Sequence, residues 1–225
     1  ALTLRCLLSQ STLPDYVILW IAADEFSSLP LDVLALRSAR FRIERCDDLR
    51  SFKKFIFAVE TWPSAFLVTC DDDLYYARHW LRDLLSDYSG HARTVVAHRT
   101  RRIQFDQDGR LLPYMRWPLN HGAGDESTLF LPTCGAGALF PPESLSRDVL
   151  SREFLSLCPE ADDIWLYWML RKAGSIVRQS HTPFPLYNWP GTQAVALWDQ
   201  NGALGGNDRQ IRNMIEHFGF PDPHA

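Results

Sequence analysis

The chain has 225 residues, of which 46% are hydrophobic, and this is enough to bury one sizeable core. Its formal net charge is −4, from 27 acidic and 23 Lys and Arg residues. Neither sign forms a long run, which argues against electrostatic binding along a nucleic-acid backbone. The longest apolar run, residues 16–23, is far shorter than the roughly 20 residues of a membrane-spanning helix.

Strand-like and helix-like segments alternate along the first ninety residues. Short apolar runs rich in β-formers are typical of buried strands, and apolar residues at helical spacing are typical of covering helices. We expect a helix at 1–11, a strand at 15–22, a helix at 29–39, a strand at 41–46, a helix at 51–62 capped by Ser51, a strand at 65–70 and a helix at 76–88. This alternation predicts an α/β fold with a mainly parallel sheet covered by helices on both faces.

The pattern changes after residue 93. We expect a strand at 94–99, a hairpin around 107–109, a Gly-bearing strand at 133–142, and a helix at 162–174 that stops at Gly174. A long ordered loop at 182–206, which carries Trp189, Leu197 and Trp198, precedes a last helix at 207–220 capped by Asn207 or Asp208.

Three consecutive aspartates, Asp71, Asp72 and Asp73, follow the strand expected at 65–70. One of them could cap the next helix, but a cap uses one carboxylate and not three. Ligands bind at the carboxyl ends of strands in open α/β sheets, and clustered carboxylates repel each other unless a cation or a proton lies between them. The triplet therefore favours a Mg²⁺ or Mn²⁺ site that leaves positions for substrate phosphates.

A second acidic cluster, "CPEADDIW", contains Glu160, Asp162 and Asp163 at the start of the helix expected at 162–174. Acids favour a helix N-terminus through capping and the helix dipole, so this cluster alone is equally well explained by structure. Together with the triplet it offers one acidic group for a metal and another for a proton, which is the minimum for attack by a hydroxyl on an activated phosphate ester.

Three weaker candidates remain open at this stage. Gly135 and Gly137 allow a ligand to approach the backbone, although helix packing explains them equally well. His181 could be a late metal ligand, although a lone His is more often structural. Lys53 and Lys54 are either an ordinary helix surface or a phosphate contact.

Several motifs together resemble one family. These are "LLSQSTLPDYVILW", "DDLRSFKKFI", "VTCDDDLYYARHWL", "CGAGALFPP", "CPEADDIWLYWML" and "NWPGTQ". They are similar to a family-2-like group of bacterial GT-A-fold glycosyltransferases that build surface polysaccharides. The resemblance covers nearly the whole chain, and it implies one GT-A-like domain over 1–225 that is built on a mainly parallel mixed sheet, with a nucleotide- and metal-binding half at about 1–100 and an acceptor and catalytic half at about 101–225.

The resemblance also implies roles for the acidic residues. Asp73 would bind the metal directly, with Asp71 nearer the ribose or the metal. His181 is kept as a further candidate metal ligand on its residue type alone. Asp163 would be the base that deprotonates the acceptor hydroxyl, with Asp162 as the alternative because the pair here reads Asp-Asp. The donor would be bordered by the following residues: Asp71, Asp72, Asp48, Lys53, Lys54, Gly135, Ala136 and Gly137.

The function implied is transfer of a hexose from a nucleotide-diphosphate sugar to a hydroxyl of a saccharide or glycolipid acceptor, with inversion and with Mn²⁺ or Mg²⁺. The five separated cysteines, the lack of an Asn-x-Ser/Thr acceptor and the lack of a basic-then-apolar leader favour a cytoplasmic protein, which could associate with the inner face of the membrane. Because the chain opens on a helix, the first GT-A strand is expected to be missing.

Two other readings stay open. In a phosphohydrolase Asp71 would be the nucleophile, although Tyr75 stands where such enzymes usually have a small hydroxyl residue. The chain could also be a non-catalytic sugar- or nucleotide-binding domain.

Overall fold

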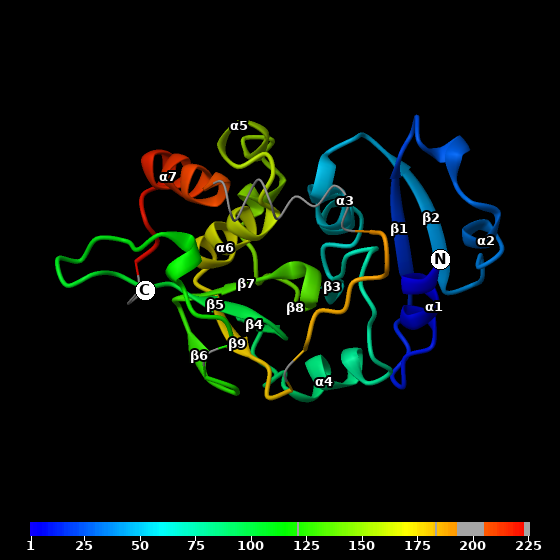
Figure 1. Cartoon of the computed structure of the whole chain (residues 1–225), viewed down its shortest axis with the longest axis horizontal. Helices are drawn as coiled ribbons and strands as arrows, with labels where there is room; N and C mark the ends of the chain where they lie inside the picture. The colour runs from blue at the N-terminus through cyan, green and yellow to red at the C-terminus, as the bar shows by residue number, and fades with distance from the viewer. Residues whose placement is uncertain (121, 183, 193–204, 223–225) are drawn as a thin grey trace.

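A computed structural model describes residues 1–120, 122–182, 184–192 and 205–222 (Figure 1). The described helices are α1 (Leu2–Leu8), α2 (Leu31–Leu34), α3 (Lys53–Thr61), α4 (Trp80–Ser86), α5 (Phe154–Leu157), α6 (Asp162–Lys172) and α7 (Gly206–Phe218). The strands are β1 (Val17–Ala22), β2 (Phe41–Cys46), β3 (Leu67–Thr69), β4 (Thr94–Ala97), β5 (Thr100–Arg102), β6 (Glu126–Ser127), β7 (Phe130–Pro132), β8 (Ala138–Phe140) and β9 (Ile176–Gln179). The protein therefore belongs to the α/β class.

The strands form a mixed five-stranded sheet and two smaller pairs. The order in the large sheet is β3-β8-β4-β9-β6, while β1 pairs with β2 and β5 with β7. Among these strands only the β1–β2 and β4–β9 pairings are parallel. The prediction of a mixed sheet is therefore confirmed, but the prediction that its pairings are mainly parallel is wrong. Parallel neighbours need a crossover, usually a helix, and the described chain between β4 and β8 contains no α-helix.

The core lies on both faces of the large sheet, as expected. Side chains alternate between the faces of a strand. Val95 and Ala97 of β4 accordingly pack with α3, α6 and α7, whereas Val96 between them packs with α1 and α4. Figure 1 shows α6 and α4 on opposite sides of the sheet. The helix α6 is buried around nearly its whole circumference, because the sheet, α7 and the segment 147–150 surround it.

Several element boundaries differ from the sequence predictions. The helix expected at 29–39 is the single turn α2, in which only Val33 is buried. Ser51 does not cap α3, because a 3₁₀ turn at Arg50–Phe52 comes first and Phe52 occupies the cap position. The last helix is preceded by Gly205 in the left-handed conformation, so neither Asn207 nor Asp208 caps it. Asp208 instead accepts a hydrogen bond from the backbone N–H of Tyr114.

Other predictions are confirmed. The chain opens on the helix α1, β2 has the expected bounds, and α6 begins at Asp162 with a left-handed Gly174 after its end. A hairpin turn lies at 106–110, where Asp106 and Arg110 are joined by a backbone hydrogen bond of 2.8 Å. In the loop expected at 182–206, the described part includes Trp189, whereas Leu197 and Trp198 lie outside the described residues.

Candidate functional site

Polar residues gather at one edge of the large sheet. The strands β3, β4 and β9 run in the same direction, because β3 and β4 both oppose β8 and β9 is parallel to β4. Asp71 follows β3, Arg99 follows β4 and His181 follows β9. The chain enters β8 at this same edge, through the 3₁₀ turn Cys134–Ala136. Ligands of open α/β sheets bind at such carboxyl ends.

Lys54, in the first turn of α3, joins the two acidic motifs. Its Nζ lies 2.7 Å from Asp71 Oδ1 and 2.9 Å from Asp162 Oδ2. The side chain of Lys54 is 20% exposed, that of Asp162 is 10% exposed and that of Asp71 is 40% exposed, so the Asp162 pair is the more deeply buried. We refer to Lys54, Asp71, Asp162 and Asp163 as the Lys54 cluster.

The charge of Lys54 is stabilised by its neighbours. Burial on its own disfavours the ammonium, but the carboxylates of Asp162, Asp71 and Asp163 together hold the pKa of Lys54 well above its ordinary value. Lys54 is therefore a permanent cation at neutral pH. It partly compensates the repulsion between acids that approach from two separate elements.

Asp163 is a half-buried acid with a proton affinity suited to neutral pH. Loss of hydration raises its pKa, and the adjacent charge of Asp162 raises it further, while Lys54 and both the backbone N–H and the side chain of Cys134 lower it. The balance places the pKa of Asp163 at about 7. The Cys134 N–H donates to Asp163 Oδ1 at 2.8 Å, which fixes the carboxylate against the turn before β8. A general base with a pKa near the working pH is the most effective one.

The turn at Cys134–Ala136 and Asp71 fit closely together. The backbone N–H of Asp71 donates to the Tyr76 hydroxyl at 2.8 Å, and this hydroxyl donates to the carbonyl of Gly135. A Cβ atom on Gly135 would collide with the Asp71 carboxylate. Burial holds the pKa of Tyr76 well above its ordinary value, so its hydroxyl keeps the proton that it donates.

Gly137 has a related role on the other side of the turn. Its φ of +115° lies in a region that favours glycine, and a Cβ there would meet the Trp80 ring. The Trp80 Nε1 donates to the carbonyl of Ala136 at 2.8 Å. The segment expected to border the donor is thus held by Tyr76 and Trp80, which follow the aspartate triplet in the sequence.

Asp72 and Asp73 are held mainly through their backbone. The Thr3 hydroxyl donates to the carbonyl of Asp72, whose side chain is exposed, and the N–H of Trp189 donates to the carbonyl of Asp73 at 2.9 Å. The helix α4 begins only at Trp80, with His79 at its cap position. The alternative reading, in which one of the three aspartates caps this helix, is therefore excluded.

Lys53 and Asp48 form a separate pair. Lys53 Nζ lies 2.8 Å from Asp48 Oδ1 and 3.8 Å from Glu25 Oε2. Asp48 follows β2 and Glu25 follows β1, so this pair lies at the carboxyl ends of the parallel β1–β2 ribbon. The two neighbouring lysines thus serve different clusters, which the sequence did not distinguish.

His181 contacts a different acid from the expected ones. Its Nδ1 lies 2.7 Å from Asp87 Oδ1, and its backbone N–H donates to Asp87 Oδ2 at 3.0 Å. Asp87 also accepts from Ser180, and these hydrogen bonds outweigh burial and lower the pKa of Asp87. The ligation of a metal by His181 stays a prediction, and these contacts do not support it.

Asp71 and Asp73 are the other two expected metal ligands. Within the described ranges, no three His, Cys, Asp or Glu side chains form a group that could hold a metal ion together. The carboxylates of Asp71 and Asp73 are hard oxygen donors. One or two carboxylates, completed by water and substrate phosphates, are the set that Mg²⁺ usually takes. The residues present therefore fit an ion that arrives with a phosphate-bearing substrate.

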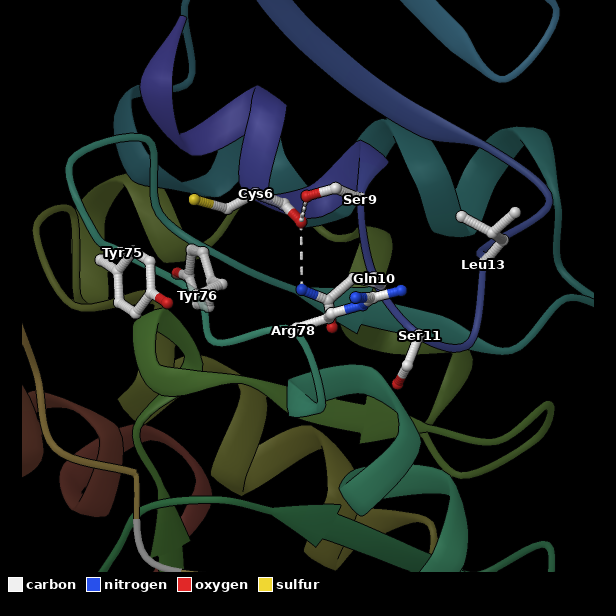
Figure 2. A pocket seen from close by; sticks show the side chains of 8 residues that line it. All are labelled: Cys6, Ser9, Gln10, Ser11, Leu13, Tyr75, Tyr76 and Arg78. Carbon is white, nitrogen blue, oxygen red and sulfur yellow. Dashed lines mark hydrogen bonds between the residues drawn. The ribbon is translucent and has the colours of Figure 1, made fainter.

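A cavity of about 640 Å³ lies between α1 and the segment 75–78 (Figure 2). Buried Gln10 borders it, but all of the polar groups of its side chain are used: the amide donates to the carbonyls of Cys6 and Ala77, and the oxygen accepts from the N–H of Leu81. The lining residues are Cys6, Ser9, Gln10, Ser11, Leu13, Tyr75, Tyr76 and Arg78. None belongs to the Lys54 cluster, so we place the chemistry at the cluster and not in this cavity.

Sequence reasoning missed several residues at this edge. Tyr76 was assigned to a helix, and Arg99, Thr133 and Tyr114 were not singled out. Arg99 lies two residues after the end of the buried strand β4, as Asp71 lies two residues after β3, and this position was the available signal.

Comparisons with known proteins assign this chain to no family. No protein-family model and no curated protein matches this chain. None of the helices in the described ranges is long and apolar enough to cross a membrane.

Proposed function

We propose that the chain is a glycosyltransferase that moves a hexose from a nucleotide-diphosphate sugar to a hydroxyl of a saccharide or glycolipid acceptor, with inversion. The observation that carries this proposal is the Lys54 cluster, in which Asp163, with a pKa of about 7, lies beside two acids joined by one lysine. The resemblance of the motifs to GT-A enzymes of bacterial surface polysaccharide synthesis points the same way.

In the proposed reaction Asp163 acts as the base. Its carboxylate takes the proton of the acceptor hydroxyl while the hydroxyl oxygen attacks the anomeric carbon of the donor. The bond between that carbon and the diphosphate oxygen breaks, and the nucleotide diphosphate leaves with the bonding electrons. Direct displacement from the opposite side inverts the anomeric centre. The Cys134 N–H and the charge of Lys54 stabilise the ionised form of Asp163 before the proton arrives.

Asp71 and Asp73 would hold a Mn²⁺ or Mg²⁺ ion, which when bound neutralises charge on the leaving diphosphate. Lys54 forms ion pairs with Asp71, on the proposed donor side, and with Asp162, next to the proposed base. It therefore fixes the positions of these two sides of the site relative to each other. Gly135 lets the Asp71 carboxylate pack directly against the turn before β8, so the proposed metal ligand and the segment that would border the donor sugar lie together.

The test is a product assay on the full chain with a panel of nucleotide-diphosphate hexoses, a mixture of saccharide acceptors and Mn²⁺. We expect release of nucleotide diphosphate that depends on both the acceptor and the metal, and at least a hundredfold loss in Asp163→Asn, consistent with the contribution of a general base. Asp108→Asn, on the exposed turn of the hairpin, is the matched control and should keep wild-type turnover.

Two outcomes would overturn the proposal. Metal-dependent binding of nucleotide sugars without transfer to any acceptor would indicate a binding domain. A covalent aspartyl-phosphate on Asp71, trapped during turnover of a phosphate ester, would indicate a phosphohydrolase.

A further inference from the structure

Arg99 lies at the same edge of the large sheet. It comes two residues after the end of β4, and its carbonyl accepts a hydrogen bond from the backbone N–H of Thr133 at 2.9 Å. Its Nη1 lies 3.4 Å from Thr133 Oγ1. Thr133 precedes Cys134, whose N–H holds Asp163. The guanidinium is therefore attached to the same turn that positions the proposed base.

The charge of Arg99 is poorly compensated. Within the described residues, no carboxylate lies within the 4.0 Å of an ion pair from its guanidinium, and its one side-chain hydrogen bond is the long contact with Thr133. The side chain is half-buried. Burial lowers the pKa of Arg99, the nearby guanidinium of Arg101 lowers it as well, and Tyr114 and the more distant Asp163 act in the opposite direction.

A second guanidinium, that of Arg101, adds a like charge near Arg99. Arg101 is buried, its Cζ lies 4.5 Å from the centre of the Tyr114 ring, and its Nη1 donates to the carbonyl of Trp117 at 2.9 Å. Two like charges partly removed from water repel each other. A bound anion would relieve this repulsion. A guanidinium presents five N–H donors in a planar fork, which matches the two oxygens of a carboxylate or phosphate.

We propose that Arg99 binds an oxyanion carried by the acceptor, either the carboxylate of an acidic sugar or a phosphate group, and so selects negatively charged acceptors. The identification of the ligand as an acceptor rests on the proposed function, but the anion site itself does not. With the oxyanion on Arg99, the attached sugar is placed beside the turn 133–134 and within reach of Asp163. Arg99 is thus a specificity-determining residue.

Binding of three small probes to the full chain tests the site without any donor or metal. The probes are glucuronate, glucose 6-phosphate and glucose, measured by NMR titration. We expect both anionic probes to bind at least about tenfold more tightly than glucose, since a pair of charge-assisted hydrogen bonds from a guanidinium to an oxyanion contributes at least that much affinity. Arg99→Gln should remove the preference, and Arg99→Lys should keep only part of it, because it keeps the charge but loses the fork. A preference for only one of the two anions identifies the source of the oxyanion.

Arg102→Gln is the matched control, since it removes the same charge from an exposed position three residues away. It should bind all three probes as the wild type does. Equal binding of glucose and the anionic probes by the wild type, or an equal loss in Arg99→Gln and Arg102→Gln, would overturn the inference. A circular dichroism melt of each variant separates loss of binding from loss of fold.

The two proposals fail separately. If anion binding depends on Arg99 but no donor supports transfer, the site stands and the glycosyltransferase proposal falls. If transfer occurs with the same KM for acidic and neutral acceptors in wild type and in Arg99→Gln, the enzyme stands and the anion site falls. If both hold, Arg99→Gln raises the KM for an acidic acceptor about tenfold or more, with little change in kcat or in the KM for the donor.

Discussion

Lys54 Nζ and Asp162 Oδ2 lie 2.9 Å apart and are both largely shielded from solvent, which makes this ion pair the link between α3 and the start of α6. The same Nζ contacts Asp71 after β3. The consecutive elements α3 and β3 and the distant helix α6 therefore meet at a single ammonium group. An interaction of this kind contributes to stability and to the geometry of the site together, and the two contributions can be separated experimentally.

Replacing Lys54 by Met leaves Asp71 and Asp162 facing each other without a cation. Because removal of one partner of a buried pair leaves a charge uncompensated, we expect a loss of about 2–4 kcal/mol in the free energy of unfolding, measured by urea denaturation. Lys172→Met is the control, since Lys172 pairs with Asp148 where both side chains are about half exposed, and such pairs contribute about 0–1 kcal/mol. Equal losses in the two variants would contradict the structural role of Lys54.

The pKa of Asp163 predicts how stability depends on pH. The folded-state pKa of about 7 lies above the ordinary value of 3.8, so the folded protein binds the proton more tightly than the unfolded chain between these values. The contribution of this group is fully favourable below about pH 4, declines as pH rises to about 7, and stays unfavourable above that. Asp163→Asn keeps a side-chain oxygen for the Cys134 N–H and removes the charge.

We therefore expect Asp163→Asn to be more stable than the wild type at pH 8, by on the order of 2–4 kcal/mol, and nearly equal to it at pH 4. Thermal unfolding at a series of pH values measures the difference. A difference between the two proteins that does not change with pH would show that folding does not raise the pKa of Asp163. Loss of transfer in a variant that gains stability would support a catalytic role and argue against a structural one.

Gly135→Ala places a methyl group against the Asp71 carboxylate. Either Asp71 or the turn must move, so we expect transfer to fall at least tenfold and stability to fall by about 1–3 kcal/mol. Gly90→Ala is the control, because Gly90 has a positive φ but open space around it. It should lose about 1 kcal/mol through backbone strain and keep full activity. Full activity in Gly135→Ala would mean that the position of Asp71 does not matter.

Thr3→Val tests whether α1 holds the aspartate segment. The buried Thr3 hydroxyl donates to the carbonyls of Asp72 and Leu74 and accepts from the Trp189 Nε1. Its removal leaves buried polar groups without this partner, at a cost of about 1–3 kcal/mol. We expect faster hydrogen exchange at the backbone N–H of Tyr75 and Trp189. Thr61→Val, at an exposed helix position, should change neither quantity.

Local sequence patterns predicted the elements that are determined locally. The β2 strand and the helix α6 follow directly from their apolar runs and end signals. The start of α4 could not be predicted, because Leu74 pairs with Asn188 and the Tyr75 N–H donates to Tyr187, and this distant pairing delays the helix to Trp80. The direction of β8 likewise depends on its partners and not on its own residues.

The functional site shows the same difference between features that local sequence predicts and features that depend on distant contacts. A strand end rich in carboxylates identified Asp71, and the second acidic motif identified Asp162 and Asp163. The choice between Lys53 and Lys54 depends on the rotation of α3 relative to β3, which no local pattern encodes. The contact between Gly135 and Asp71 and the placement of Arg99 beside Thr133 arise from the packing of separate segments.

The backbone N–H of residue 134 donates to Asp163, and the Cys134 side chain also interacts with this carboxylate and lowers its pKa. Any replacement of Cys134 except proline keeps this donor, so the orientation of Asp163 is protected against most mutations at that position. The fully buried Cys134 side chain adds a second interaction that only some residues can replace. Cys134→Ser should therefore keep the pH profile of the reaction close to that of the wild type, whereas Cys134→Ala should move its rising limb to higher pH.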